Sequence, residues 1–248
     1  MAGQQDPVQG VDMRLCGFGP AFGLADASPF VLKVEAFLRW QGLAYDKVND
    51  LGAVRRTRNR KLPMLEVGGV TVSDSHAIIA HVVSTRGLVI DADLSPAQRA
   101  QAYWVARALE EHVYFVFLWM RWWPDETWPQ VREALFGGVP AWVRPALSSV
   151  VRRSIKKQAW AQGVARYPEA QLHAMLDEAL VQLAEGLGEQ TYWFGDEVHE
   201  IDTLLYAFLA PVLVSSFDSP HVARLRSHHR LLAYAQRLHQ RLGFDGAT

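Results

Sequence analysis

The side chains best suited to chemistry lie in the first third of the chain, at the predicted starts of two helices. Ser28 precedes Pro29, which is the order expected of an N-cap residue and the first helical position. Asp74-Ser75 precedes apolar positions at helical spacing, and the free N–H groups of such a helix start favour a bound carboxylate. Pro63 opens a short strand nearby, so this region is suited to hold a small peptide. An ordinary hairpin followed by a capped helix would give the same pattern.

The cysteine and the histidines of the chain indicate no further catalytic or metal site. Cys16 is the only cysteine in 248 residues, which excludes an internal disulfide, and its predicted strand makes it a small core residue. The nine histidines are dispersed, and neither His228-His229 nor the pair His76 and His81 has ligand spacing, so we expect no metal site. No glycine-rich nucleotide-binding motif occurs, and a net charge of −1 argues against a nucleic-acid partner.

The elements that must position these residues form a mixed first part and a helical second part. Strands are predicted at Met13–Phe18 and 43–48, on either side of the helix that begins at Ser28, and Gly68-Gly69 joins two more strands in a hairpin. After a linker at 88–94 no further convincing strand follows. Helices are predicted from Ser95 to Pro124, at Trp128–Phe136, at Trp142–Gln162, at Pro168–Leu187, from Ile201 to a kink or exit at Pro211, and at Leu231–Leu242. We therefore predict an α/β domain at 13–88 and an all-α domain at 95–243.

The chain shows no sign of insertion into a membrane. Its first residues, Met1 to Asp12, are polar and are expected to be a disordered lead-in rather than a signal peptide. No apolar run approaches the roughly 20 residues that span a bilayer, so we expect no integral membrane segment and a cytoplasmic location.

Several motifs resemble those of one family. Leu-Pro-x-Leu from Leu62, a glycine turn, and Asp-Ser-x-x-Ile-Ile from Asp74 resemble the second half of the thioredoxin-like domain of glutathione transferases. The best match is to the metaxin and failed-axon-connections branch, which includes bacterial members. It is carried by Ala27-Ser28-Pro29-Phe30-x-x-Lys33, the aromatic stretch Trp119 to Trp128, and Phe194-Gly195-Asp196 before Asp202. His199 departs from the family pattern, because Ser or Thr is usual at that cap position.

The resemblance implies a binding site for glutathione. In the family the proline corresponding to Pro63 is cis, the backbone of the residue at Leu62 pairs with the cysteinyl part, and Asp74 and Ser75 hold the γ-glutamyl end. The segment 48–61 leaves little room for the family's second helix. Its cations, with Lys61 the best placed, either form a rim for the glycyl carboxylate or a solvated charged loop.

The resemblance also assigns roles to Ser28 and to three tryptophans. Ser28 is the expected catalytic residue, since its hydroxyl and the helix start would stabilise the thiolate of glutathione. Alternatively, Ser28 only starts a helix. Trp119, Trp122 and Trp123 border the cleft where an apolar substrate would lie, or else they are buried structural aromatics.

The implied function is conjugation of the glutathione thiolate to a small apolar electrophile. The implied fold is a thioredoxin-like α/β N-terminal domain followed by an all-α C-terminal domain, and the family habit is a homodimer. The alternative is a non-catalytic binding module that kept this fold. In that case the basic helix at Trp142–Gln162 is a face for a partner or an anionic surface, unless it is merely solvated.

Overall fold

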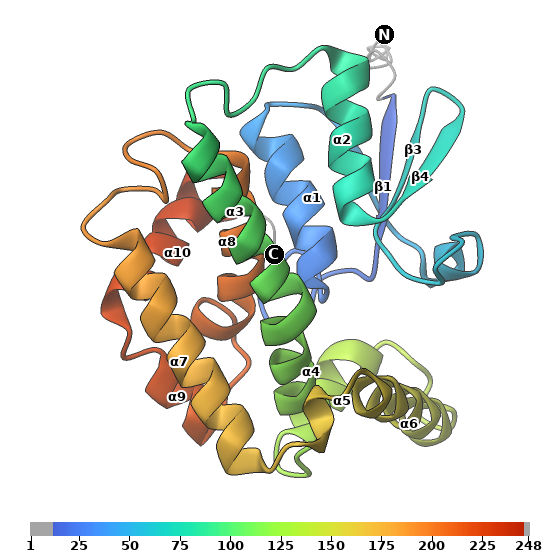
Figure 1. Cartoon of the computed structure of the whole chain (residues 1–248). Coiled ribbons are helices and arrows are strands. Elements are labelled where there is room, and N and C mark those ends of the chain that lie inside the picture. Colours follow the sequence, from blue (N-terminus) through green and yellow to red (C-terminus); the bar gives the residue numbers. More distant parts are fainter. Residues whose placement is uncertain (1–11, 246–248) are drawn as a thin grey trace, which may run out of the picture.

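The computed structural model describes residues 12–245 and is built around one four-stranded sheet (Figure 1). The strands β1 (Met13–Gly17), β2 (Asp46–Asn49), β3 (Met64–Val67) and β4 (Val70–Ser73) lie in the order β2-β1-β3-β4. β2 runs parallel to β1, whereas β3 is antiparallel to both of its neighbours. Apart from Asp12, the predicted lead-in Met1–Asp12 lies outside the described residues.

Two helices pack beside the sheet. α1 (Pro29–Trp40) follows β1 and α2 (Ser75–Arg86) follows β4, and the two helices contact each other (Figure 1). Apolar side chains of β1, β3, α1 and α2 form a shared core. Between β2 and β3 the structure has only a 3-10 turn, η1 (Leu51–Arg55), which confirms that this segment is too short for a full helix.

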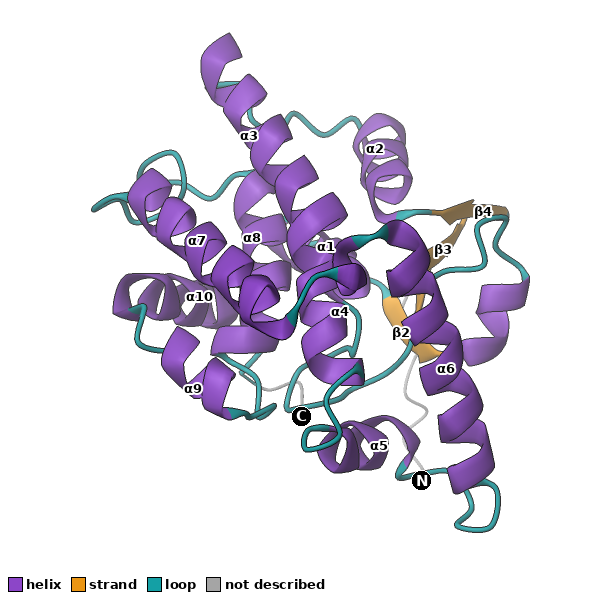
Figure 2. Ribbon diagram, turned by 60° about the horizontal axis from the view of Figure 1, so that its bottom comes forward, coloured by secondary structure: helices purple, strands orange, loops and turns teal. Residues whose placement is uncertain are grey.

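In the second half of the described chain all the named elements are helices (Figure 2). Its first three segments, α3 (Pro96–Ala108), η2 (Leu109–Val113) and α4 (Tyr114–Trp122), follow one another without a break. The remaining segments are α5 (Trp128–Phe136), α6 (Arg144–Gln162), η3 (Val164–Arg166), α7 (Glu169–Leu187), α8 (Glu200–Leu213), α9 (Pro220–Leu225) and α10 (His229–Arg241). The predicted fold class, a thioredoxin-like α/β part followed by an all-α part, is confirmed.

α8 joins the two parts, because it packs against both α1 and α10. Every α8 residue from Ile201 to Leu213 is buried, including Pro211, which lies in the last turn before the helix ends. Phe208 of α8 meets Phe30 of α1 edge to face at 5.5 Å between ring centroids. Because α8 ends at Leu213, two residues after Pro211, the predicted exit of this helix near Pro211 is confirmed.

A buried ion pair also crosses between the two parts. Lys33 of α1 donates to Glu110 of η2 at 2.8 Å, and both side chains are almost wholly buried. Glu110 lies in a π-helical segment within the long helix that was expected to be regular. Periodicity of apolar residues does not reveal such a one-turn change of winding, which is often found near functional sites.

No helix within residues 12–245 combines the length and the apolar character needed to cross a bilayer.

Candidate functional site

Strand pairing brings the predicted site residues to one end of the sheet. Cys16 near the end of β1 pairs with Met64 at the start of β3, and Met64 pairs with Ser73 at the end of β4. The loop before α1, the segment before β3 and the start of α2 therefore converge at this end. These three segments carry Ser28, Leu62-Pro63 and Asp74-Ser75, respectively.

The segment before β3 offers an unpaired backbone to a ligand. The Leu62–Pro63 peptide bond is cis, and both residues are buried. Neither the N–H nor the C=O of Leu62 finds a hydrogen-bond partner within residues 12–245. Buried backbone groups are nearly always paired, so Leu62 has one donor and one acceptor available for an extended peptide.

Asp74 and Ser75 form the start of α2 in an unusual backbone conformation. Asp74 has a φ of 84°, in the left-handed region that few non-glycine residues adopt and that is often found at ligand-binding positions. Its Oδ1 accepts the N–H groups of His76 at 3.0 Å and Ala77 at 3.1 Å. Two of the helix-start donors are therefore already used, as the capped helix start predicted from Asp74-Ser75 implies. At this helix start, Ser75 remains to bind the carboxylate of a ligand. The Asp74 carboxylate remains to bind an ammonium group of a ligand.

Ser28 is the N-cap residue of α1, as expected, but its side chain does not cap the helix. Its backbone is extended, with φ −102° and ψ 125°, and its hydroxyl makes no hydrogen bond to the first turn. The N–H groups of Phe30 and Val31 have no intrahelical partners, because they belong to that first turn. The half-buried hydroxyl and the positive end of α1 are thus both available to an anion.

Asp26 fixes the backbone of Ser28 from the preceding loop. The fully buried Asp26 carboxylate accepts the N–H of Ser28 at 3.0 Å and that of Gly19 at 3.1 Å, and Lys47 lies 3.3 Å away. Gly17 leaves room for it, since a Cβ there would stand 2.2 Å from Oδ2 of Asp26. Burial raises the pKa of Asp26, while Lys47 and the two amides oppose that rise.

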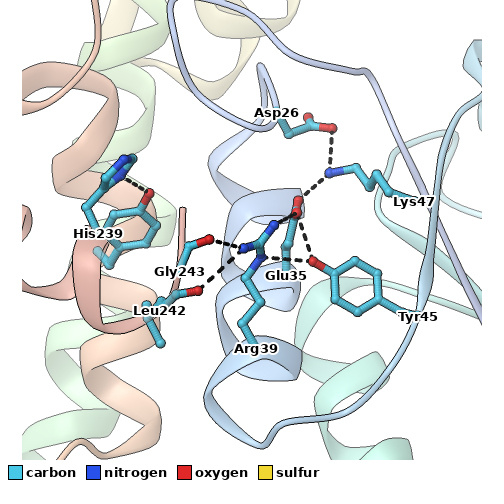
Figure 3. A network of polar contacts seen from close by, with 9 residues as sticks. Asp26, Glu35, Arg39, Tyr45, Lys47, His239, Leu242 and Gly243 are labelled. Atoms are coloured by element: carbon cyan, nitrogen blue, oxygen red, sulfur yellow. Dashed lines mark hydrogen bonds and ion pairs between the residues drawn. The ribbon is translucent and has the colours of Figure 1, made fainter. Parts of the chain in front are cut away.

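The contacts of Lys47 continue to the far end of the chain (Figure 3). Lys47 also pairs with the buried Glu35, which accepts from Tyr45 at 2.9 Å and from Arg39 at 3.3 Å. Arg39 in turn donates to the carbonyl of Gly243. Burial, followed by the charge of Glu35, raises the pKa of Tyr45 far above its ordinary value. The Ser28 loop is therefore coupled to the end of the last helix.

The position of Asp26 relative to Ser28 is itself a sequence signal for this contact. An aspartate often accepts the N–H two residues further on, and Asp26 stands two residues before the expected N-cap Ser28. No comparable signal exists for Lys47 or Glu35, whose meeting depends on how β2 packs against α1.

A cation from the helical part supports the same loop. Arg121 of α4 donates to the carbonyl of Ala27 at 3.0 Å, immediately before Ser28. Its guanidinium lies 4.9 Å from the ring centre of Phe22 and 5.8 Å from that of Phe217. Burial lowers the pKa of Arg121 to about 10, so the group stays charged at neutral pH. Arg121 thus holds the Ser28 loop against α4.

Lys61 is exposed at the end of the basic segment before Leu62. Its backbone N–H is bound by Thr57 Oγ1 at 3.0 Å and Asn59 Oδ1 at 3.2 Å, which orders the turn. Arg56 of the same segment is neutralised by Asp50 and Glu66, so it does not contribute a free cation. The role of Lys61 as a rim for a carboxylate stays a prediction.

The three candidate tryptophans differ in accessibility. Trp119 and Trp122 are buried, and Trp122 packs on Trp128 at 5.8 Å between ring centroids. Trp123 is only half-buried, and the Lys156 ammonium lies 5.0 Å from its ring centre. Trp119 and Trp122 therefore occupy the positions expected of structural aromatics, and a contact with substrate stays a prediction.

The remaining candidate, Cys16, is buried in β1 and free. Its burial confirms that Cys16 is a core residue, and burial followed by the charge of Glu66 raises the pKa of its thiol. Within residues 12–245 no three His, Cys, Asp or Glu side chains are grouped as a metal ion would require.

Two family models match this chain. A model described as the glutathione S-transferase N-terminal domain matches residues 29–128, and one described as the glutathione S-transferase C-terminal domain matches residues 176–238. The first match extends past the linker predicted at 88–94, so the exact domain boundaries stay a prediction.

Individual proteins are similar over most of the chain. The isoprene-epoxide–glutathione S-transferase of a Rhodococcus species is 32% identical over 200 residues, which cover 78% of this chain and 83% of that protein. Human metaxin-2 is 23% identical over 211 residues, covering 84% of this chain and 80% of the relative. Among solved structures, glutathione transferase GSTFuA3 from Phanerochaete chrysosporium aligns with a TM-score of 0.63 at 19% identity, covering 91% of this chain and 95% of that one.

Proposed function

This chain belongs to the glutathione S-transferase family, and from that premise we propose that it binds glutathione at the end of the sheet and conjugates it to an electrophile. The resemblance to metaxins is confirmed as well. The observation that carries the proposal is the unpaired backbone of Leu62 beside the start of α2.

Each part of the tripeptide has a chemically suitable place. The backbone of Leu62 pairs with the cysteinyl residue as a short strand addition. The γ-glutamyl end is a zwitterion: its ammonium group meets the Asp74 carboxylate, and its carboxylate meets Ser75. The glycyl carboxylate lies toward Lys61, the exposed cation next to Leu62.

The reaction that we propose is attack of the thiolate sulfur on an electrophilic carbon. Ser28 donates a hydrogen bond to the sulfur, and the start of α1 adds partial positive charge, so the thiol loses its proton to solvent near neutral pH. A carbon–sulfur bond forms, and the leaving group, or the ring oxygen of an epoxide, takes up the displaced electron pair. The relative named for isoprene epoxide supports a small apolar electrophile of this class.

The first test is calorimetric titration of reduced glutathione into the full-length protein. We expect binding that is lost in Asp74→Ala and in Ser75→Ala. Asp46→Ala is the matched control, because Asp46 is an exposed aspartate at the start of β2, at the other end of the sheet. Equal binding by all variants would place glutathione elsewhere.

Absence of binding at millimolar glutathione would favour the second candidate function, a non-catalytic binding module. The observations that favour this candidate are the similarity to metaxin-2 and the reduction of the second helix to the 3-10 turn η1. A homodimer and a cytoplasmic location stay predictions for either function.

A further inference from the structure

Helix α6 carries charge of one sign. Between Arg144 and Gln162 it has five arginine and lysine residues and no aspartate or glutamate. On one side it packs against α4, α5 and η3. Figures 1 and 2 show it at the rim of the helical part, so its other side faces away from the core.

Three of the five cations fasten α6 to its neighbours. Arg152 donates to the carbonyls of Trp122 and Trp123, each at 2.8 Å. Lys156 donates to the carbonyl of Trp123 at 3.1 Å, and Arg144 pairs with Glu133 at 2.9 Å. These three cations are used inside the fold, where they satisfy carbonyls at the end of α4 and a carboxylate of α5.

The other two cations, Arg153 and Lys157, are exposed and form no ion pair within residues 12–245. They lie between large apolar side chains that are also exposed: Val150 is 61% exposed and Trp160 is 53% exposed. Steps of three and four residues separate these four positions, so they share one face of the helix. Trp142, which is 86% exposed, precedes the helix at its other end.

We propose that this α6 outer face, formed by Trp142, Val150, Arg153, Lys157 and Trp160, binds the surface of a bilayer that contains anionic lipids. The helix from Arg144 to Trp160 is about 24 Å long at 1.5 Å per residue, and Trp142 lies in the turn just before it, so a helix lying flat places both tryptophans at the headgroup level. Arg153 and Lys157 meet anionic headgroups, and Val150 enters the acyl boundary.

The arrangement of charge favours a lipid surface over other occupants. A groove on a protein partner would require a continuous apolar stripe, whereas here Arg153 and Lys157 separate Val150 from Trp160. A nucleic acid would engage the two cations but would leave Val150 and Trp142 in water. Lysine and arginine together with exposed tryptophan are the residue types found in helices that lie in a membrane interface.

The test is co-sedimentation of the full-length protein with vesicles of phosphatidylcholine, with and without phosphatidylglycerol. We expect binding to the anionic vesicles only, weakened by salt. Arg153→Gln with Lys157→Gln lowers the affinity roughly thirtyfold, since each cation near such a surface contributes about 1 kcal/mol. We also expect vesicle binding to shift the tryptophan emission to the blue. Trp142→Ser with Trp160→Ser should lower the affinity for the vesicles and remove this shift.

Two control variants test whether the loss of affinity for the vesicles is specific to α6. Trp104→Ser removes another tryptophan, 68% exposed on α3, and Arg55→Gln with Arg58→Gln removes two exposed cations near η1. Circular dichroism verifies that every variant is folded. The proposal is overturned if the wild-type protein ignores anionic vesicles at low salt, if the controls weaken binding as much as the α6 variants, or if only a nucleic acid is bound. None of these outcomes bears on glutathione binding, which calorimetry measures separately.

Discussion

Ser28 and Ser95 each stand before a proline at the start of a helix, yet their side chains are used differently. The Ser95 hydroxyl accepts the N–H of Gln98 at 3.3 Å, and the Gln98 side chain accepts the N–H of Ser95 at 2.9 Å, which is a full capping box. At α1 the N–H of Ser28 is accepted instead by Asp26, from the loop before the helix. The Ser28 hydroxyl makes no capping bond.

The difference shows how a common N-cap residue can be left free for another partner. In a capping box, the side chain three positions after the cap reaches back, but at α1 that position is the apolar Val31. Asp26 instead accepts the N–H of Ser28, and the Ser28 hydroxyl makes no hydrogen bond within residues 12–245. We expect helix α3 to depend on its serine for stability and α1 to depend on Asp26.

The largest expected effect is that of Asp26→Ala on stability. The N–H groups of Ser28 and Gly19 lose their buried acceptor, and we expect the free energy of unfolding to fall by about 3 kcal/mol. Urea denaturation followed by circular dichroism measures the loss. Gln98→Ala is the control: the same kind of acceptor is removed from an exposed helix start, and a much smaller loss is expected. Equal losses would mean that Asp26 has no special role.

The next effect is on the rate of the reaction. Ser28→Ala removes one hydrogen bond to the thiolate, so we expect kcat/KM for a model electrophile to fall roughly thirtyfold. The pKa of bound glutathione, read from the absorbance of the thiolate, should rise at the same time. Stability should hardly change, because no cap is lost. Unchanged activity together with reduced stability would show that Ser28 only starts α1.

A smaller effect is expected for Ser95→Ala, which opens the capping box of α3. We expect it to lower the free energy of unfolding by about 1 kcal/mol and to leave glutathione binding unchanged. Thermal unfolding and calorimetry of the same preparation give both values. A Ser95 variant as stable as the wild type would remove the contrast between the two helix starts.

The smallest effect at neutral pH concerns the third Ser-Pro helix start, at Ser219-Pro220. Ser219 caps α9, and His221 in its first turn stacks on His173 at 3.8 Å between ring centroids. Burial, followed by the charge of His173, lowers the pKa of His221 to about 4. In the unfolded chain His221 takes up a proton near pH 6.5, whereas in the folded protein it does so only near pH 4. The free energy of unfolding therefore falls as the pH drops from 6.5 toward 4.

His221→Phe keeps a stacked ring and removes this titration. We expect the variant to match the wild type at neutral pH and to lose less stability on acidification, as measured by urea denaturation at both pH values. Asp177 and Arg224 also face His221 and remain in both proteins, as does His173. A variant with the same pH dependence as the wild type would show that His221 is not the group that titrates.

Local signals predicted most of the fold. Apolar spacing after a Ser-Pro start indicated α1 and α3, apolar spacing alone indicated α7, and the pair Gly68-Gly69 indicated the hairpin. They did not reveal that α1 is buried almost all round, because the side facing α8 carries Lys33, a residue that sequence patterns place in solvent. The short helix α9 was missed as well: it has a Ser-Pro start, but its six residues are too few to show an apolar period.

The candidate site was predictable where its residues are neighbours in the sequence. Leu62-Pro63 and Asp74-Ser75 belong to one hairpin and its helix, so a single motif indicates them. Arg121 comes from a distant helix and reaches the Ser28 loop only through packing. The positive φ of Asp74 depends on how β4 meets α2, which residue types alone do not specify.

The burial of Lys33 depends on residues that come far later in the chain. Its partner Glu110 is 77 positions later, and the helix that covers the same side of α1 does not begin until Glu200. On a ribosome the sheet and its helices would emerge long before these partners, with a charged group and one whole side of α1 in water. The thioredoxin-like part therefore completes its packing only after α8 has been synthesised.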